Sequence, residues 1–321
     1  MKIAYLASGR PDLEARIPAD SDHVIVGAGP DGQYRPDDLN KIADADAFIV
    51  SMEPVHEQIL AAAKNLKIVQ RLGAGYETLD LEAAARQGIP CCNIEGVNKE
   101  AVAEHCMTLI LALTKCLFKA EALTRQCQWA EARWLTRQAF ELKGKTIGII
   151  GLGNTGSELA KRAKGFEMTV IYNDIRAIDP KLVRDAAATF VEKPELFRTA
   201  DIVSVNTDLN PTSRNMINAE TLAMMKPTAL LICCARGGVL DEEALRNTLN
   251  DGGITAAGID VFEREPIKPD NPLLQAQNVI LTSHVAGMTE ETSQRIFDWA
   301  YENVRAVVER GERPRWVRNG V

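Results

Sequence analysis

The sequence lacks the features that would place it in a membrane, in a secretory pathway or on a nucleic acid. No stretch approaches the roughly 20 consecutive apolar residues of a membrane-spanning helix, because the run Leu109–Leu113 is soon followed by Lys115. The apolar start, Ile3–Ala7, meets Arg10 and is too short for a signal peptide. Acidic residues outnumber basic ones by 44 to 37, which gives a net charge of -7. Nucleic-acid binding needs the opposite balance.

Histidine is scarce, and cysteine shows no metal-binding spacing. The seven cysteines include two adjacent pairs, Cys91-Cys92 and Cys233-Cys234, but no CxxC motif and no Cys/His cluster. We therefore expect no metal site and reduced thiols in a cytoplasmic protein. Of only four histidines, His105 lies in the middle of a predicted helix, where a structural or interface role is expected.

Short apolar runs alternate with amphipathic helical patterns along 321 residues, a length typical of about two domains. This alternation predicts an α/β protein with parallel sheets and right-handed crossovers. The expected strands are 3–6, 24–26, 47–50, 68–71, 146–150, 169–172, 202–205, 229–233, 256–259 and 279–281.

Two long helical patterns, 99–125 and 290–309, mark the domain boundaries. The segment between them contains its own complete strand-helix series. We therefore predict a discontinuous first domain, residues 1–98 with 289–321, and a second domain, 99–288, inserted into it. The helix over 99–125 is apolar around much of its surface, which predicts burial against a second subunit.

A glycine motif, GxGxxG, follows the apolar strand at 146–150. Gly151 permits a tight turn, Gly153 lets the backbone approach a pyrophosphate, and Gly156 permits close helix-strand packing. The helix that begins at Asn154 and Thr155 presents free N–H groups to the phosphate. Asp174 ends the next strand, where a carboxylate binds ribose hydroxyls and repels a 2′-phosphate. The motif predicts a Rossmann domain that prefers NAD to NADP, and the nearby Arg176 is the feature that could weaken this preference.

Three polar residues follow three other predicted strands of the same sheet. His284 follows the strand at 279–281, Glu265 follows the one at 256–259, and Arg236 follows the one at 229–233. Ligands bind at the carboxyl ends of strands in open α/β sheets. A carboxylate can fix the tautomer of an imidazole, and a guanidinium can hold a substrate carboxylate by two bonds.

Six segments together resemble the D-isomer-specific 2-hydroxyacid dehydrogenase family, over nearly the whole chain. They begin at Arg71, Val102, Gly151, Met225, Gly258 and Ser283 and include Val-Ala-Glu-His, Cys-Ala-Arg-Gly-Gly and Ser-His-Val-Ala-Gly. The resemblance implies a Rossmann NAD-binding domain inserted into a discontinuous flavodoxin-like α/β substrate domain. It also implies a homodimer through the NAD-binding domain, with Trp129 and Trp134 near the contact.

The resemblance assigns roles residue by residue. Arg236 is implied to bind the substrate carboxylate and carbonyl, Glu265 to partner the histidine, and His284 to act as acid/base. Asp260 is implied to bind the nicotinamide carboxamide. The remaining implied residues are Thr207 and Cys234 beside the cofactor and Gly73, Ala74 and Gly75, which present N–H groups to the substrate carboxylate.

The chain departs from the family pattern at Cys233, where asparagine is usual, at Asn206 and Asp208, where histidine and proline are usual, and at Asn154, which is often basic. None of these changes touches the Arg-Glu-His set. The expected function is therefore NAD-dependent interconversion of a 2-oxo acid and a D-2-hydroxy acid.

Two alternatives stay open. A phosphoglycerate dehydrogenase usually has an arginine after the third strand, where this chain has Ser51-Met52-Glu53-Pro54, and Glu53 would repel a phosphate. An NAD-sensing corepressor-like binding protein would carry interaction tails, whereas this chain ends soon after its last helix.

Overall fold

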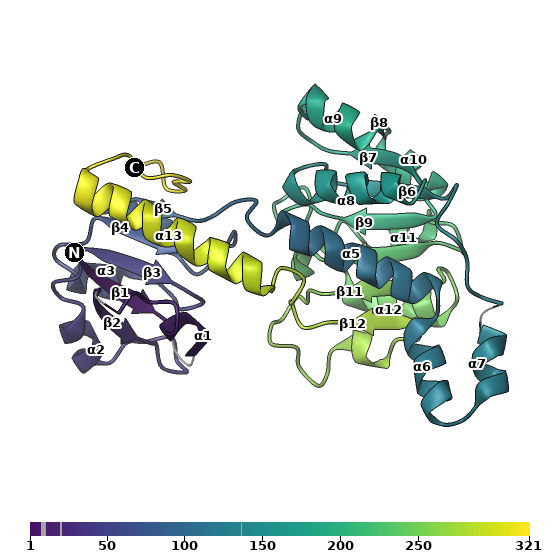
Figure 1. Cartoon of the computed structure of the whole chain (residues 1–321), viewed down its shortest axis with the longest axis horizontal. Helices are drawn as coiled ribbons and strands as arrows, with labels where there is room; N and C mark the ends of the chain where they lie inside the picture. The colour runs from purple at the N-terminus through teal and green to yellow at the C-terminus, as the bar shows by residue number, and fades with distance from the viewer. Residues whose placement is uncertain (8–10, 20, 136) are drawn as a thin grey trace. The chain divides into compact units, whose positions relative to one another are not determined.

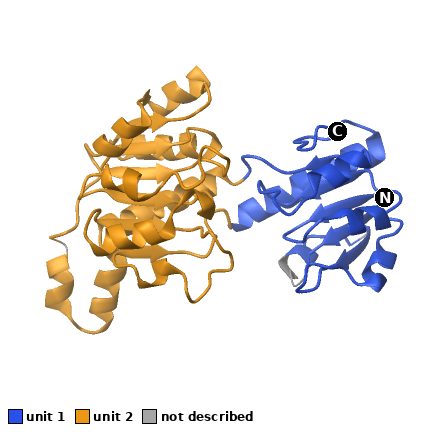
Figure 2. Cartoon of the chain, turned by 180° about the vertical axis from the view of Figure 1, so that it is seen from behind, with its two compact units in different colours: residues 1–97, 289–321 blue, residues 98–288 orange. Residues whose placement is uncertain are grey.

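The computed structural model describes residues 1–7, 11–19, 21–135 and 137–321. They form two compact units: unit 1 comprises residues 1–97 and 289–321, and unit 2 comprises residues 98–288 (Figure 2). These bounds differ by one residue from the predicted ones. Each unit is built on its own parallel sheet, which confirms the predicted α/β class.

Unit 1 has a five-stranded sheet in the order β2-β1-β3-β4-β5, with every neighbouring pair parallel. This is the flavodoxin-like order. Its elements are β1 (Lys2–Leu6), α1 (Pro11–Glu14), β2 (Asp22–Val26), α2 (Pro36–Lys41), β3 (Ala47–Val50), α3 (Glu57–Ala62), β4 (Ile68–Arg71), α4 (Leu81–Arg86), β5 (Cys91–Cys92) and α13 (Glu290–Arg310).

The strands of unit 1 bury side chains on both faces, as parallel strands do. Phe48 and Val50 of β3 pack with α3 and α4, whereas Ile49 packs on the other face with Phe297 and Val304 of α13. Because α13 comes from the end of the chain, it returns after unit 2 to complete the core of unit 1 (Figure 1).

Unit 2 has a seven-stranded parallel sheet in the order β12-β11-β10-β9-β6-β7-β8. This is the Rossmann order with one added strand at the β12 edge. Its elements are α5 (Lys99–Thr114), α6 (Leu117–Arg125), α7 (Trp129–Leu135), β6 (Thr146–Ile150), α8 (Asn154–Gly165), β7 (Thr169–Asn173), α9 (Pro180–Ala186), β8 (Ala188–Phe190), α10 (Lys193–Thr199), β9 (Ile202–Val205), α11 (Ala219–Ala223), β10 (Leu230–Cys233), the 3₁₀ helix η1 (Gly237–Val239), α12 (Glu242–Asn250), β11 (Ala256–Ile259), η2 (Pro272–Gln275) and β12 (Val279–Leu281).

Helices cover both faces of this sheet. Ile149 of β6 packs with α5 and α8 on one face, and Ile150, its neighbour, packs on the other face with the core to which α10, α11 and α12 contribute. Successive strand residues point to opposite faces, so each strand joins two cores. Open α/β sheets bind ligands at the carboxyl ends of their strands, so a site is expected at that end of this sheet.

The predicted single helix over 99–125 is wrong. The chain breaks after Thr114, Cys116 takes a left-handed φ of 52°, and α6 leaves α5 at an angle of 59°. Helix α6 has no buried residue within this chain, so the predicted burial of residues 117–125 against a second subunit stays a prediction. Figure 1 shows α6 and α7 side by side, projecting from the sheet of unit 2. The short strands β5 and β8 were not predicted as strands.

Within the described ranges, no single helix is long and apolar enough to cross a membrane. The bent pair α5 and α6 meets that test only when the two are taken together, by length and composition alone.

Candidate active site

Three neighbouring strands of unit 2 deliver three polar loops to one edge of the sheet. Arg236 follows β10, Glu265 follows β11, and His284 follows β12. These strands are adjacent and parallel, with Cys233 opposite Ile259 and Ile259 opposite Leu281. Their carboxyl ends therefore lie in one row, the position at which open α/β sheets bind ligands.

Glu265 and His284 form a direct pair. Oε2 of Glu265 lies 2.6 Å from Nδ1 of His284, while the other carboxylate oxygen, Oε1, accepts the backbone N–H of Phe262 at 2.9 Å. Both side chains keep access to solvent, with 45% of His284 and 34% of Glu265 exposed. Because Nδ1 is occupied by the carboxylate, Nε2 is the nitrogen left to exchange a proton with a substrate.

The loop that carries Arg236 packs tightly against the loop that carries Glu265. A Cβ atom on Gly237 would come within 1.9 Å of the backbone of Phe262, so only glycine fits after the arginine. The guanidinium of Arg236 donates to the carbonyl of Ala235 at 2.8 Å. This close packing fixes the backbone of both loops at the same edge of the sheet.

Asp260 is fully buried and fastens the loop that follows β12. Its Oδ1 accepts the hydroxyl of Thr282 at 2.5 Å and the N–H of Val285 at 3.0 Å, and its Oδ2 accepts the N–H of Ala286 at 2.9 Å. Its carbonyl accepts the N–H of His284 at 2.8 Å. These bonds hold His284 in its left-handed conformation, with φ of 56°. The predicted contact of Asp260 with a nicotinamide carboxamide stays a prediction.

Two residues in this network were not assigned to the site from the sequence. Nε2 of His105, on α5, lies 3.1 Å from the hydroxyl of Thr282 and 3.7 Å from Oδ1 of Asp260. His105 therefore contacts the base of the His284 loop, in agreement with the structural role expected for it. Thr282 had no sequence signal beyond its place at the end of β12.

The glycine loop after β6 has the geometry that a dinucleotide requires. Gly151 has a φ of 89°, and a Cβ atom on Gly156 would lie 2.0 Å from the carbonyl oxygen of Gly151. Helix α8 therefore begins directly against the turn, at Asn154 and Thr155. The N–H groups of its first turn have no acceptor within the helix, so they are available to a pyrophosphate.

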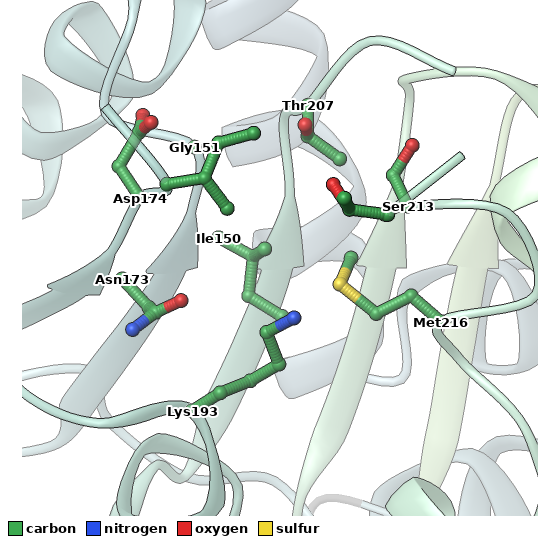
Figure 3. A pocket seen from close by; sticks show the side chains of 10 residues that line it. Ile150, Gly151, Asn173, Asp174, Lys193, Thr207, Ser213 and Met216 are labelled. Carbon is green, nitrogen blue, oxygen red and sulfur yellow. The ribbon is translucent and has the colours of Figure 1, made fainter. Parts of the chain in front are cut away.

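Asp174 lies beside this loop with its side chain only 4% exposed. Its carboxylate accepts N–H groups from Leu152 and from Arg176, each at 2.9 Å. Gly151, Asp174 and Thr207 line one pocket, together with Lys193 (Figure 3). Lys193 had no sequence signal, and with Arg176 it brings a second cation near Asp174. The glycine turn, the free N–H groups and this carboxylate fit the pyrophosphate and ribose of NAD.

Of the residues that depart from the family pattern, Cys233 is buried, Asn206 is half-buried, and Asp208 and Asn154 are exposed. Burial raises the pKa of the Cys233 thiol to about 12. A hydrogen bond with Cys106, and then burial, raise the pKa of Cys234 well above the usual thiol range. Both thiols are therefore protonated near neutral pH and are not nucleophiles. The side chain of Asn206 donates to the hydroxyl of Ser204, and the carboxylate of Asp208 accepts from the hydroxyl of Thr207 and from the side-chain amide of Asn210.

The predicted substrate-carboxylate loop lies in unit 1, directly after β4. Gly73 has a φ of 131°, which an L side chain rarely adopts, and its carbonyl accepts the N–H of Ile94. The side chain of Asn93 donates to the carbonyl of Ala74 at 2.7 Å. These bonds hold the carbonyls of Gly73 and Ala74, and Gly75 follows them in the same loop after β4.

Comparisons with known proteins identify the family of the chain. Residues 107–286 match the family described as D-isomer specific 2-hydroxyacid dehydrogenase, NAD binding domain. A glyoxylate reductase of Thermofilum pendens is 39% identical over 282 residues, which cover 86% of this chain and 82% of the relative. A D-3-phosphoglycerate dehydrogenase of Methanocaldococcus jannaschii is also 39% identical, over 85% of this chain but 52% of its own length.

Solved structures match over nearly the full length of the chain. A glyoxylate reductase from Paecilomyes thermophila superposes with a TM-score of 0.82 at 28% identity, over 97% of this chain and 96% of that one. The holo form of Rhodotorula graminis D-mandelate dehydrogenase gives 0.87 at 25% identity, over 100% and 98%. The chain therefore belongs to the D-isomer-specific 2-hydroxyacid dehydrogenase family, and unit 2 contains its NAD-binding domain.

Proposed function

We propose that this NAD-dependent oxidoreductase reduces a small 2-oxo acid of the glyoxylate or hydroxypyruvate type to the 2-hydroxy acid, with His284 as the acid/base. The observation that carries the proposal is the 2.6 Å contact between Glu265 and His284 at the carboxyl edge of the Rossmann sheet. Because 45% of its side chain is exposed, His284 can exchange a proton with a substrate, which a buried structural histidine cannot do.

The residues divide the work of the reaction. Bound NADH supplies the hydride that the C2 carbon of the 2-oxo acid accepts. His284, protonated and held by Glu265, donates a proton from Nε2 to the oxygen on C2, which completes the hydroxyl group. Arg236 binds the substrate carboxylate and stabilises negative charge as it grows on that oxygen. In the reverse direction His284 accepts the proton.

The cofactor-binding residues act through shape and charge. The N–H groups of the loop at Gly153, Asn154 and Thr155 bind the pyrophosphate, and Asp174 accepts hydrogen bonds from the ribose hydroxyls. Thr207 and Cys234 lie at the ends of β9 and β10 and are proposed to flank the cofactor. Gly73, Ala74 and Gly75 are proposed to donate backbone N–H groups to the substrate carboxylate.

The substrate class follows from the loop after β3. Glu53 occupies this loop, and its carboxylate accepts the N–H of Ala28 at 3.1 Å. A fixed negative charge here disfavours a phosphorylated substrate and leaves a 2-oxo acid with an uncharged or small side chain as the better candidate. The glyoxylate reductases among the relatives support the same choice.

A panel of 2-oxo acids assayed with NADH tests the proposal. We expect the highest kcat/KM for glyoxylate or hydroxypyruvate. A Glu53→Gln variant, assayed on the same panel, tests whether this charge excludes phosphorylated acids. A preference of the wild type for 3-phosphohydroxypyruvate would instead identify a phosphoglycerate dehydrogenase. NADH binding without turnover of any acid would support an NAD-sensing binding protein.

The assembly that fits unit 2 is a homodimer. Leu117, Phe118, Trp129 and Trp134 on the projecting helices α6 and α7 are more than half exposed. Large apolar side chains exposed on two adjacent helices are typical of an interaction site. We assign it to a second copy of the same chain, since closed two-fold dimers are the commonest soluble assemblies.

A further inference from the structure

Three possible metal ligands, a nitrogen, a sulfur and an oxygen, lie together next to the loop that carries His284. None of them takes part in the proposed proton transfer. One imidazole nitrogen of His105, Sγ of Cys234 and a carboxylate oxygen of Asp260 all lie within 4.8 Å of one another. They come from three elements that pack together: α5, the loop after β10 and the loop after β11. The nearest measured pair, Nε2 of His105 and Oδ1 of Asp260, is 3.7 Å apart.

This donor set has the chemistry of a zinc site. Imidazole, thiolate and carboxylate are the three ligand types that Zn²⁺ takes in proteins, at about 2.0 to 2.3 Å. Tetrahedral ligands at such distances are roughly 3.5 Å apart, so the His105–Asp260 spacing already fits. Sγ of Cys234 lies within 4.8 Å of the other two atoms, so it needs a shift of roughly 1.3 Å or less, and its thiol gives up a proton on binding the ion. The thiol of Cys106, which bonds to Cys234, adds a second sulfur beside the group.

We propose that His105, Cys234 and Asp260 form a binding site for a soft divalent cation of the Zn²⁺ class, and that the bound ion inhibits the enzyme. An ion would enter from the side of His105, whose side chain is 19% exposed, and of the partly buried Cys234, whereas Asp260 is fully buried behind them. A hard ion such as Mg²⁺, which prefers an all-oxygen shell, does not compete for it.

The bound ion inhibits the enzyme because it competes with hydrogen bonds that Asp260 already accepts. Its Oδ1 fastens Thr282 and Val285, on either side of His284. An ion that binds this oxygen weakens both bonds and releases the backbone that keeps His284 in its left-handed conformation. His284 then loses its fixed position beside Glu265. This inhibitory step rests on the proposed function of His284, whereas binding of the ion does not.

Co²⁺ added to the purified, full-length protein without cofactor tests the binding step. A bound thiolate gives Co²⁺ an intense charge-transfer band in the near ultraviolet, and Zn²⁺ should remove that band by competition. We expect one Co²⁺ per chain, and at least tenfold weaker binding for Cys234→Ser and for His105→Gln. Cys127→Ser, which removes the exposed thiol between α6 and α7, is the matched control and should keep the band.

Zn²⁺ inhibition, measured relative to the zinc-free rate of each variant, tests the second step. We expect reversible inhibition of the wild type and of Cys127→Ser, relieved by a chelator, and at least tenfold weaker inhibition of Cys234→Ser. A band unchanged in Cys234→Ser, or lost in Cys127→Ser, would overturn the site. Equal inhibition of Cys234→Ser and the wild type would overturn the link to His284. If no 2-oxo acid is reduced, the Co²⁺ titration still decides the site separately from the proposed function.

Discussion

The carboxylate of Glu265 reaches Nδ1 of His284 at 2.6 Å, although the two residues are 19 positions apart and follow different strands. Two backbone features hold the pair in place. The N–H of Phe262 binds the second oxygen of Glu265, and the carbonyl of Asp260 binds the N–H of His284. Backbone groups in the loops after β11 and β12 therefore fix the positions of Glu265 and His284 relative to each other.

Glu265→Gln should leave the fold intact and reduce the rate of 2-oxo acid reduction by about tenfold or more. A neutral amide keeps the shape of the side chain but stabilises the charged imidazolium less. The pH-rate profile for reduction should therefore move to lower pH, while the affinity for NADH, measured by fluorescence, stays close to that of the wild type. An unchanged profile would mean that Glu265 only supports the loop.

Asp174 should make the enzyme prefer NADH to NADPH by at least about tenfold in kcat/KM, because its carboxylate repels a 2′-phosphate. Asp174→Ser should lower this ratio, whereas Asp179→Ser, which removes the capping carboxylate of α9, should not. Arg176 and Lys193 lie near Asp174 and oppose its charge. Equal or better use of NADPH by the wild type would reject the NAD assignment and point to these two cations.

Asp201 should contribute to the stability of unit 2 at neutral pH and not in acid. Burial alone would raise the pKa of Asp201, but hydrogen bonds from Lys226 and from the N–H of Thr146 outweigh it and lower the pKa. A lowered pKa in the folded state gives stability that is present above about pH 4 and is lost as the pH falls through the folded value.

The matched variant is Asp201→Asn, whose amide oxygen can still accept the N–H of Thr146. We expect a lower melting temperature at pH 7, corresponding to about 1 kcal/mol or less for this partly exposed pair. The difference from the wild type should shrink towards pH 3. The same difference at both values of pH would show that the ionised carboxylate of Asp201 does not stabilise the fold.

The exposed tryptophans of α7 should hold the dimer together. Light scattering at micromolar concentration should give about twice the 35.2 kDa of one chain for the wild type. Trp129→Glu places a charge on the apolar surface and should shift the mass towards one chain, whereas Phe190→Glu, on the exposed side of β8, should not. A monomeric wild type would contradict the proposed assembly.

Local patterns in the sequence were sufficient to predict every strand except the short β5 and β8, and to place Arg236, Glu265 and His284 after three of the predicted strands. The glycine spacing at 151–156 and the apolar runs before Arg236, Glu265 and His284 depend on neighbouring residues alone. They indicated both the Rossmann unit and the edge at which these side chains lie. The roles of the side chains in catalysis stay predictions.

Features that depend on contacts between distant segments could not be predicted. The composition of residues 99–125 is typical of one continuous helix, and no residue near Cys116 indicates the left-handed backbone conformation at that position. The bonds from Thr282 and His105 towards Asp260 join three elements that meet only in the folded chain. Lys193, the first residue of α10, lines the same pocket as Asp174 although α9 and β8 lie between the two residues in the sequence.

The most direct test of the account is the turnover number of His284→Ala with NADH and saturating 2-oxo acid. His23→Gln, which alters an exposed histidine on the edge strand β2, serves as the control. We predict that kcat of His284→Ala falls by about 10²-fold or more, the scale of general acid catalysis, while NADH affinity and melting temperature stay near those of the control. A turnover number close to that of the wild type would contradict the assignment of His284 as the acid/base.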